Sequence, residues 1–170
     1  KLNMGAIAQK KFYDGGGLDC AFLSFAEIDY FGNVNVSKFG DRNDGAGGFI
    51  NIAEGAKKVI FSGTLTSSGL KTEISKGNLN ILKEGKNKKF IKKVKQITYS
   101  SKLGIKRGQN IIFNTDRGVF RFINNKITLV EIAQGIRLKE DIINQINFPI
   151  KISKNLKLIS KNIYLEKKIG

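Results

Sequence analysis

Three glycine-bearing turns separate apolar segments between residues 12 and 48, and they constrain the fold more than any other feature of the chain. The turns are Asp14-Gly15-Gly16-Gly17, Asp29-Tyr30-Phe31-Gly32 and Asp44-Gly45-Ala46-Gly47-Gly48. Because glycine has no Cβ, it adopts left-handed conformations at little cost and leaves backbone N–H groups uncovered. Such a turn can bind an anion or a developing oxyanion, or it can simply reverse the chain.

The apolar segments around these turns predict an α/β domain. Residues 19 to 28 form a nearly continuous apolar run, typical of a strand buried on both faces, and residues 34 to 36 would be its short partner. The spacing over residues 49 to 56 favours a helix that begins at the third glycine turn, and residues 58 to 65 favour a second buried strand. Residues 138 to 146 carry an amphipathic helix pattern. Further strands are expected at residues 70 to 74, 79 to 83, 90 to 99, 111 to 115, 119 to 123 and 127 to 132, with hairpins through Lys76-Gly77-Asn78 and Asn124-Asn125.

Length and composition favour one domain over residues 1 to 170. With 41% apolar residues, a chain of this length can bury a sizeable core. No charged-then-apolar leader and no apolar run near 18 residues is present, so we expect a cytoplasmic protein with no membrane partner. The first residue is Lys1, which suggests that an upstream part of a longer protein is missing.

The residue types limit the available chemistry. Cys20 is the only cysteine and the chain has no histidine, which excludes disulfides within the chain, Ser-His and Cys-His schemes, and most zinc sites. Cys20 lies in an apolar run, where a small buried residue is the expected role. Any nucleophile would be a carboxylate, a lysine or a hydroxyl, and we expect no metal site.

The net charge of +16 is concentrated in the second half. Residues 86 to 170 carry 20 of the 30 Lys and Arg residues but 5 of the 14 acids. Lysine filling of solvated positions would explain this bias, as would attraction of a phosphate-bearing ligand such as coenzyme A, or nucleic-acid binding. Arginines number only five and most aromatics lie in strand patterns, which disfavours nucleic acid.

The glycine turns and their order resemble those of the second domain of class I CoA-transferases, in the branch of propionate, acetate and acetoacetate-linked enzymes. The similarity is strongest up to Lys71 and continues more loosely to about Leu158. The similar motifs are Phe12-Tyr13-Asp14-Gly15-Gly16-Gly17-Leu18-Asp19, Gly32-Asn33-Val34-Asn35-Val36-Ser37-Lys38-Phe39-Gly40, Gly45-Ala46-Gly47-Gly48-Phe49-Ile50-Asn51-Ile52, Ala56-Lys57-Lys58-Val59-Ile60-Phe61-Ser62-Gly63-Thr64 and Ser68-Gly69-Leu70-Lys71.

This resemblance implies a three-layer α/β fold, also found in ribose-phosphate isomerases, with a mixed, mainly parallel sheet and added β-hairpins. Residues 1 to 170 would be the carboxyl-terminal part of the second, β-type domain. The implied reaction moves CoA between short-chain carboxylic acids through a glutamyl-CoA thioester. Coenzyme A would be a substrate, and no permanently bound cofactor is expected.

The resemblance also places the backbone of Gly45, Ala46, Gly47 and Gly48 beside CoA and the oxyanion. The family's nucleophilic glutamate lies in a Glu-x-Gly stretch upstream of the position of Tyr13, and no such stretch precedes Phe12. Neither Glu27, in an apolar strand, nor Glu54, on a helix face, suits that role, so no catalytic residue is assigned.

The chain is therefore expected to be an inactive fragment on its own. Its partners would be acyl-CoA, a short-chain carboxylate and a missing amino-terminal domain or separate subunit, within a homo-oligomer of the full-length protein. A non-catalytic CoA-transferase-like subunit and a basic nucleic-acid-binding domain are the alternatives.

Overall fold

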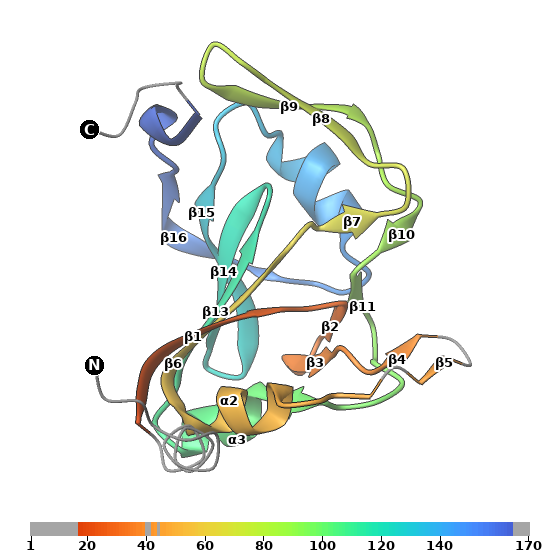
Figure 1. Cartoon of the computed structure of the whole chain (residues 1–170). Coiled ribbons are helices and arrows are strands. Elements are labelled where there is room, and N and C mark those ends of the chain that lie inside the picture. The colour runs from red at the N-terminus through yellow and green to blue at the C-terminus, as the bar shows by residue number, and fades with distance from the viewer. Residues whose placement is uncertain (1–16, 40–41, 44, 165–170) are drawn as a thin grey trace, which may run out of the picture.

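A six-stranded mixed sheet forms the centre of the computed structural model, which describes residues 17–39, 42–43 and 45–164 (Figure 1). Its strands, in spatial order, are β1 (Leu18–Ser24), β6 (Ala56–Gly63), β13 (Asn110–Thr115), β14 (Gly118–Ile123), β15 (Lys126–Ile132) and β16 (Lys151–Leu158). β1, β6 and β13 are parallel, β14 is antiparallel to both of its neighbours, and β16 is parallel to β15. The carboxyl ends of the first three strands therefore lie along one edge.

Short strands build the rest of the structure. A four-stranded sheet has the order β11 (Phe90–Ile91), β2 (Glu27–Asp29), β3 (Asn33–Asn35) and β12 (Tyr99–Ser100). Three further antiparallel pairs are β8 (Lys71–Ser75) with β9 (Asn78–Lys83), β7 (Thr66–Ser67) with β10 (Asn87–Lys88), and β4 (Lys38–Phe39) with β5 (Arg42–Asn43).

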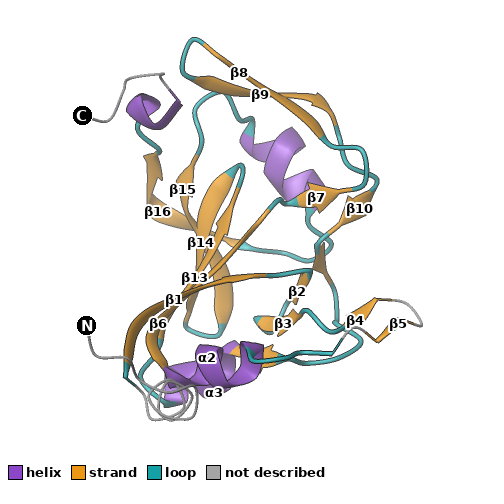
Figure 2. Cartoon of the chain, viewed as in Figure 1, coloured by secondary structure: helices purple, strands orange, loops and turns teal. Residues whose placement is uncertain are grey.

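The helical segments are short (Figure 2). They are α2 (Phe49–Gly55), α3 (Ser101–Lys106), the π-helical turn η1 (Leu138–Ile142), and the 3₁₀ turns η2 (Ile143–Gln145) and η3 (Lys161–Tyr164). In sequence, α2 leads directly into β6, and α3 leads into β13. The helices α2 and α3 lie at the lower end of the view in Figure 2, whereas η1 and η2 lie beyond the opposite end of β6 and β13, near β7.

Aromatic rings fill the core between the sheet and its surroundings. Phe61 and Phe113, on adjacent strands, are fully buried and stack with ring centres 5.7 Å apart. Phe90 and Phe120 are also fully buried, with ring centres 5.1 Å apart. The first contact joins β6 to β13 within one sheet, and the second joins β11 to β14 across two sheets, so the two larger sheets share one core.

Most sequence-predicted elements are confirmed. The α/β class with a mixed, mainly parallel sheet is present, as are the helix after the third glycine turn, the second strand and both hairpins. At the Asn124-Asn125 turn both residues have positive φ, 49° and 58°, the conformation of a two-residue hairpin turn that asparagine tolerates.

The apolar run at residues 19 to 28 was wrongly predicted to be one strand buried on both faces. It contains two strands, β1 and β2, in different sheets, separated at Phe25 and Ala26. β1 is at the edge of its sheet, and the side chain of Phe22 is 73% exposed. Apolar content alone does not distinguish an edge strand from a central one.

The predicted α-helix at residues 138 to 146 is instead a π-helical turn followed by a 3₁₀ turn. The backbone oxygen of Asp141 accepts a hydrogen bond from the Nη1 of Arg117, at 2.7 Å, and this removes one acceptor from regular helical pairing. The strand predicted at residues 90 to 99 exists only at its two ends, β11 and β12, and the sequence patterns missed α3 and β16.

Candidate functional site

The third glycine turn leads into helix α2. Gly45 and Gly47 have φ of +73° and +50°, in the left-handed region, and Gly48 is the N-cap residue of α2. The N–H of Phe49 donates to the oxygen of Ala46, at 3.0 Å, which closes the turn. Gly45, Gly47 and Gly48 are exposed. Apart from the glycine itself and its two chain neighbours, no heavy atom of the described chain lies within 4 Å of a Cβ built on Gly45 or Gly47. The turn is thus open to a ligand or to another part of the protein.

Gln109 holds the opposite end of α2. Its Nε2 donates to the backbone oxygens of Ala53, at 2.8 Å, and Ala56, at 2.6 Å, near the carboxyl end of the helix. Its Oε1 accepts a hydrogen bond from the hydroxyl of Tyr99, at 2.9 Å. Since Gln109 is only 5% exposed, these bonds are shielded from water and fix the helix relative to β13.

Asn35, which is fully buried, shapes the chain that leads from β3 toward the glycine turn. Its Oδ1 accepts hydrogen bonds from the backbone N–H groups of Ser37 and Lys38, and its Nδ2 donates to the oxygen of Lys38, at 2.7 Å. Nδ2 also donates to Oε2 of Glu27, at 2.8 Å. One amide therefore determines the turn after β3.

Neither acid weighed at the sequence level is placed as a nucleophile. Glu54 is on the exposed side of α2 and forms a 3.4 Å ion pair with Arg107, as expected of a solvated helix face. Glu27 is half-buried and is bound by Asn35. The described residues thus give no reason to assign a catalytic residue.

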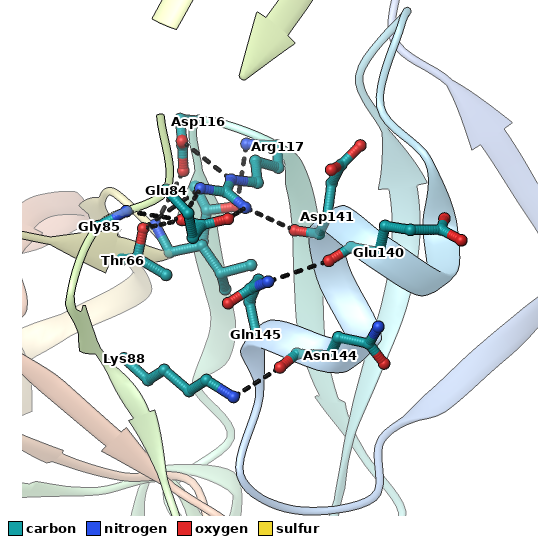
Figure 3. A network of polar contacts seen from close by, with 12 residues as sticks. Thr66, Glu84, Gly85, Lys88, Asp116, Arg117, Glu140, Asp141, Asn144 and Gln145 are labelled. Carbon is teal, nitrogen blue, oxygen red and sulfur yellow. Dashed lines mark hydrogen bonds and ion pairs between the residues drawn. The ribbon is translucent and has the colours of Figure 1, made fainter. Parts of the chain in front are cut away.

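A fully buried arginine, which the sequence patterns did not single out, organises the chain beyond the carboxyl ends of β6 and β13 (Figure 3). Arg117 donates to both carboxylate oxygens of Glu84, at 2.7 and 2.6 Å, and to the hydroxyl of Thr66, at 3.2 Å. It also contacts Asp116 and the backbone oxygen of Asp141. The network joins β7, the segment after β9, the β13–β14 turn and η1.

This network keeps its charges ionised. Burial opposes ionisation of Glu84, but hydrogen bonds from Arg117, Thr66 and the Gly85 N–H lower its pKa overall. Burial likewise opposes the charge on Arg117, and its pKa is nevertheless raised by Glu84 and Asp116. The bidentate pair therefore keeps Glu84 deprotonated and Arg117 protonated.

Three of the five arginines are engaged in ion pairs within the described chain. Arg107, Arg117 and Arg137 each pair with a carboxylate, and Arg117 has no exposed surface. Arginines engaged in this way are less available for phosphate binding.

Other predicted features have mixed outcomes. Cys20 is a free thiol of intermediate exposure, so it is less buried than predicted. The turn residues Asp14, Gly15, Gly16 and Asp44 lie outside the described residues. No helix in the described part is long and apolar enough to cross a membrane, and no group of three or more potential metal ligands occurs among the residues searched there.

Curated CoA-transferases are similar to most of this chain. Acetate CoA-transferase YdiF of Escherichia coli strain K12 is 45% identical over 163 residues, covering 96% of this chain and 31% of that protein. Caffeate CoA-transferase of Acetobacterium woodii is 47% identical over 160 residues, covering 91% and 30% respectively. The chain therefore spans about a third of the length of these relatives. No family model matches it.

Solved structures agree with this similarity. The acyl-CoA transferase YdiF apoenzyme from Escherichia coli O157:H7 matches with a TM-score of 0.95 and 44% identity, over 98% of this chain and 32% of that one. The YdiF thioester complex with CoA matches with a TM-score of 0.93 and 45% identity, over 96% and 32%. The backbone described above is thus closely shared with both YdiF structures.

Proposed function

Because this chain belongs to the class I CoA-transferase family, a family of enzymes, we propose that it is part of an acyl-CoA:carboxylate CoA-transferase. The proposed reaction moves CoA between short-chain carboxylic acids such as acetate and propionate, with CoA as a substrate and no permanently bound cofactor. The similarity over nearly the whole chain to YdiF, whose CoA thioester complex has been solved, is the observation that carries the proposal.

In this proposal the backbone amides of Gly45, Ala46, Gly47 and Gly48 contact the thioester end of CoA. A carboxylate that attacks a thioester produces a tetrahedral oxyanion, and fixed N–H donors are the usual means of stabilising it. The left-handed conformations of Gly45 and Gly47 and the exposure of the turn support this role. A side chain at Gly47 would strain the backbone and would shield the amides.

The nucleophilic glutamate comes, in this proposal, from outside residues 1 to 170, on the same polypeptide or on a separate subunit. The 170 residues form one domain, the carboxyl-terminal part of the second CoA-transferase domain, and lack activity alone. Acyl-CoA and the short-chain acid are the small-molecule partners, and the complete enzyme is a homo-oligomer. A cytoplasmic location belongs to the proposal, since CoA thioesters are intracellular substrates.

The experiment is a CoA-exchange assay on the complete enzyme that carries this chain, with acetyl-CoA as donor and propionate as acceptor. Gly47→Val is expected to reduce kcat by about 100-fold or more, the effect of losing an oxyanion donor. The matched control is Gly108→Val. Gly108 also has positive φ (+79°), is exposed and has nothing within 4 Å of a Cβ, but it follows α3. Equal kcat in the two variants would refute the role of the turn, and no exchange by the wild-type enzyme would refute the proposed reaction.

A further inference from the structure

The ammonium group of Lys89 lies at the carboxyl end of β6, the middle strand of the three parallel ones. A Cβ built on Gly63, the last residue of β6, would lie only 2.9 Å from Lys89 Nζ. The same Nζ is 4.3 Å from the ring centre of Phe25, just after β1. Ligands of α/β proteins bind outside the carboxyl ends of parallel strands. Lys89 is therefore at the edge of the sheet where a ligand is expected.

This ammonium is partly desolvated and has no polar partner in the described part of the chain. Burial lowers the pKa of Lys89, against an opposing effect of Asp116. Lys57 and Lys88 donate from Nζ to Asp19 Oδ1 and to the Asn144 oxygen, whereas Lys89 has no ion pair and no hydrogen bond there. A charge removed from water without a partner is costly, and an incoming anion would offset that cost.

A cavity of about 370 Å³ lies beside Lys89, and Phe25, Ser67 and Asn87 contribute to its lining. The acids around it already have donors. Glu27, also in the lining, accepts from Asn35, and Asp116 accepts from the backbone N–H of Leu65, at 2.8 Å, and from Arg117. Lys88 also lines the cavity and donates to the Asn144 oxygen, whereas no hydrogen bond or ion pair of the Lys89 ammonium is found among the described residues.

We propose that Lys89 and this cavity form a binding site for a carboxylate group. The inference deepens the proposed function and rests on it: in a CoA-transferase, the carboxylate is that of the free acid substrate or that of the enzyme's own nucleophilic glutamate. The ammonium donates to the carboxylate, and the hydroxyl of Ser67 and the amide of Asn87 are further donors. The Phe25 ring keeps water from one side of the ion pair.

The test uses the complete enzyme with Lys89→Met, Lys89→Arg and the control Lys86→Met, assayed for CoA exchange from propionyl-CoA to acetate. Methionine keeps an apolar stem against Phe25 but removes the charge. Lys86 is exposed in the same segment. Because removal of a desolvated charge costs the fold little, the thermal midpoint of Lys89→Met is expected to stay unchanged or rise, which separates a binding role from a structural one.

A 10- to 100-fold rise in the KM for acetate at unchanged kcat, the range for loss of one charge-assisted hydrogen bond, would identify the free acid as the ligand. A similar fall in kcat at unchanged KM would identify the nucleophilic glutamate. Lys89→Arg is expected to recover most of either loss. If Lys89→Met behaves like Lys86→Met in both constants, the carboxylate site does not exist.

A chemical labelling experiment tests the carboxylate site without relying on CoA exchange. Acetate is expected to slow the reductive methylation of Lys89, measured by peptide mass spectrometry, and to leave Lys86 unaffected. If the wild-type enzyme exchanges no CoA, the proposed function fails, and this labelling then decides the carboxylate site by itself: protection supports it and equal labelling with and without acetate overturns it.

Discussion

Replacing Arg117 by methionine is expected to destabilise the fold strongly, because it leaves a partly buried carboxylate without its partner. The Arg117 side chain is fully buried, and those of Glu84 and Asp116 are 32% and 16% exposed. Removing one member of a buried ion pair costs about 3–5 kcal/mol. For a chain of this size that corresponds to a fall in Tm of roughly 6–20 °C.

The assay is urea unfolding followed by circular dichroism, with Lys57→Met as the control. Lys57 and Asp19 also form a short ion pair, at 2.8 Å against 2.6 Å for Arg117 and Glu84, but their side chains are 75% and 87% exposed. That control is expected to have no measurable effect, since water screens exposed pairs. If both variants unfold at the same urea concentration, the Arg117 network does not stabilise the fold and the reasoning from burial is wrong.

The pH dependence gives an independent check of the same network. The pKa of Glu84 is below its ordinary value of 4.5 in the folded state, so its ion pair contributes stability above that pH and loses it as the pH falls through the folded-state pKa. Wild type is therefore expected to lose more stability than Arg117→Met between pH 5 and more acidic conditions. Parallel stability curves for the two proteins would contradict this assignment.

Two further predictions concern the end of α2. Gln109→Met is expected to cost about 1–3 kcal/mol in urea unfolding, because the oxygens of Ala53 and Ala56 lose a buried donor; an unchanged midpoint would show that water replaces it. Burial raises the pKa of Tyr99 to about 12, so the stability it contributes is present below pH 10 and is lost as the pH rises toward 12. Burial also raises the pKa of Tyr164, so an ultraviolet titration is expected to show one late-ionising tyrosine fewer in Tyr99→Phe than in wild type; an identical titration of both proteins would exclude it.

The strands that sequence predicted well are those in which local pattern and tertiary environment agree. β6, β13, β14 and β15 combine β-branched and aromatic residues with turn residues at their ends. Their buried positions are apolar except at Thr115, Gly118 and Thr128. β16 was missed because it is an edge strand with no buried residue, so its sequence carries no alternation.

The polar sites could be predicted less well, because they depend on residues far apart in the sequence. Arg117 meets Glu84 from 33 positions away, and Gln109 reaches Ala53 across 56. No residue near Lys89 in the sequence indicates that its ammonium group lies beside Gly63, at the end of β6. The glycine turn at residues 45 to 48, by contrast, could be identified from the local sequence, since the tolerance of positive φ is a property of glycine itself.

The lysines of β16 have a consequence for solubility. β16 is an outer strand of the large sheet, and an open strand edge is a template on which another molecule can add its own strand. Lys151, Lys154 and Lys157 are exposed along it. Repulsion between these side chains is expected to oppose self-association at that edge, and such a role would account for part of the chain's excess of positive charge without a ligand.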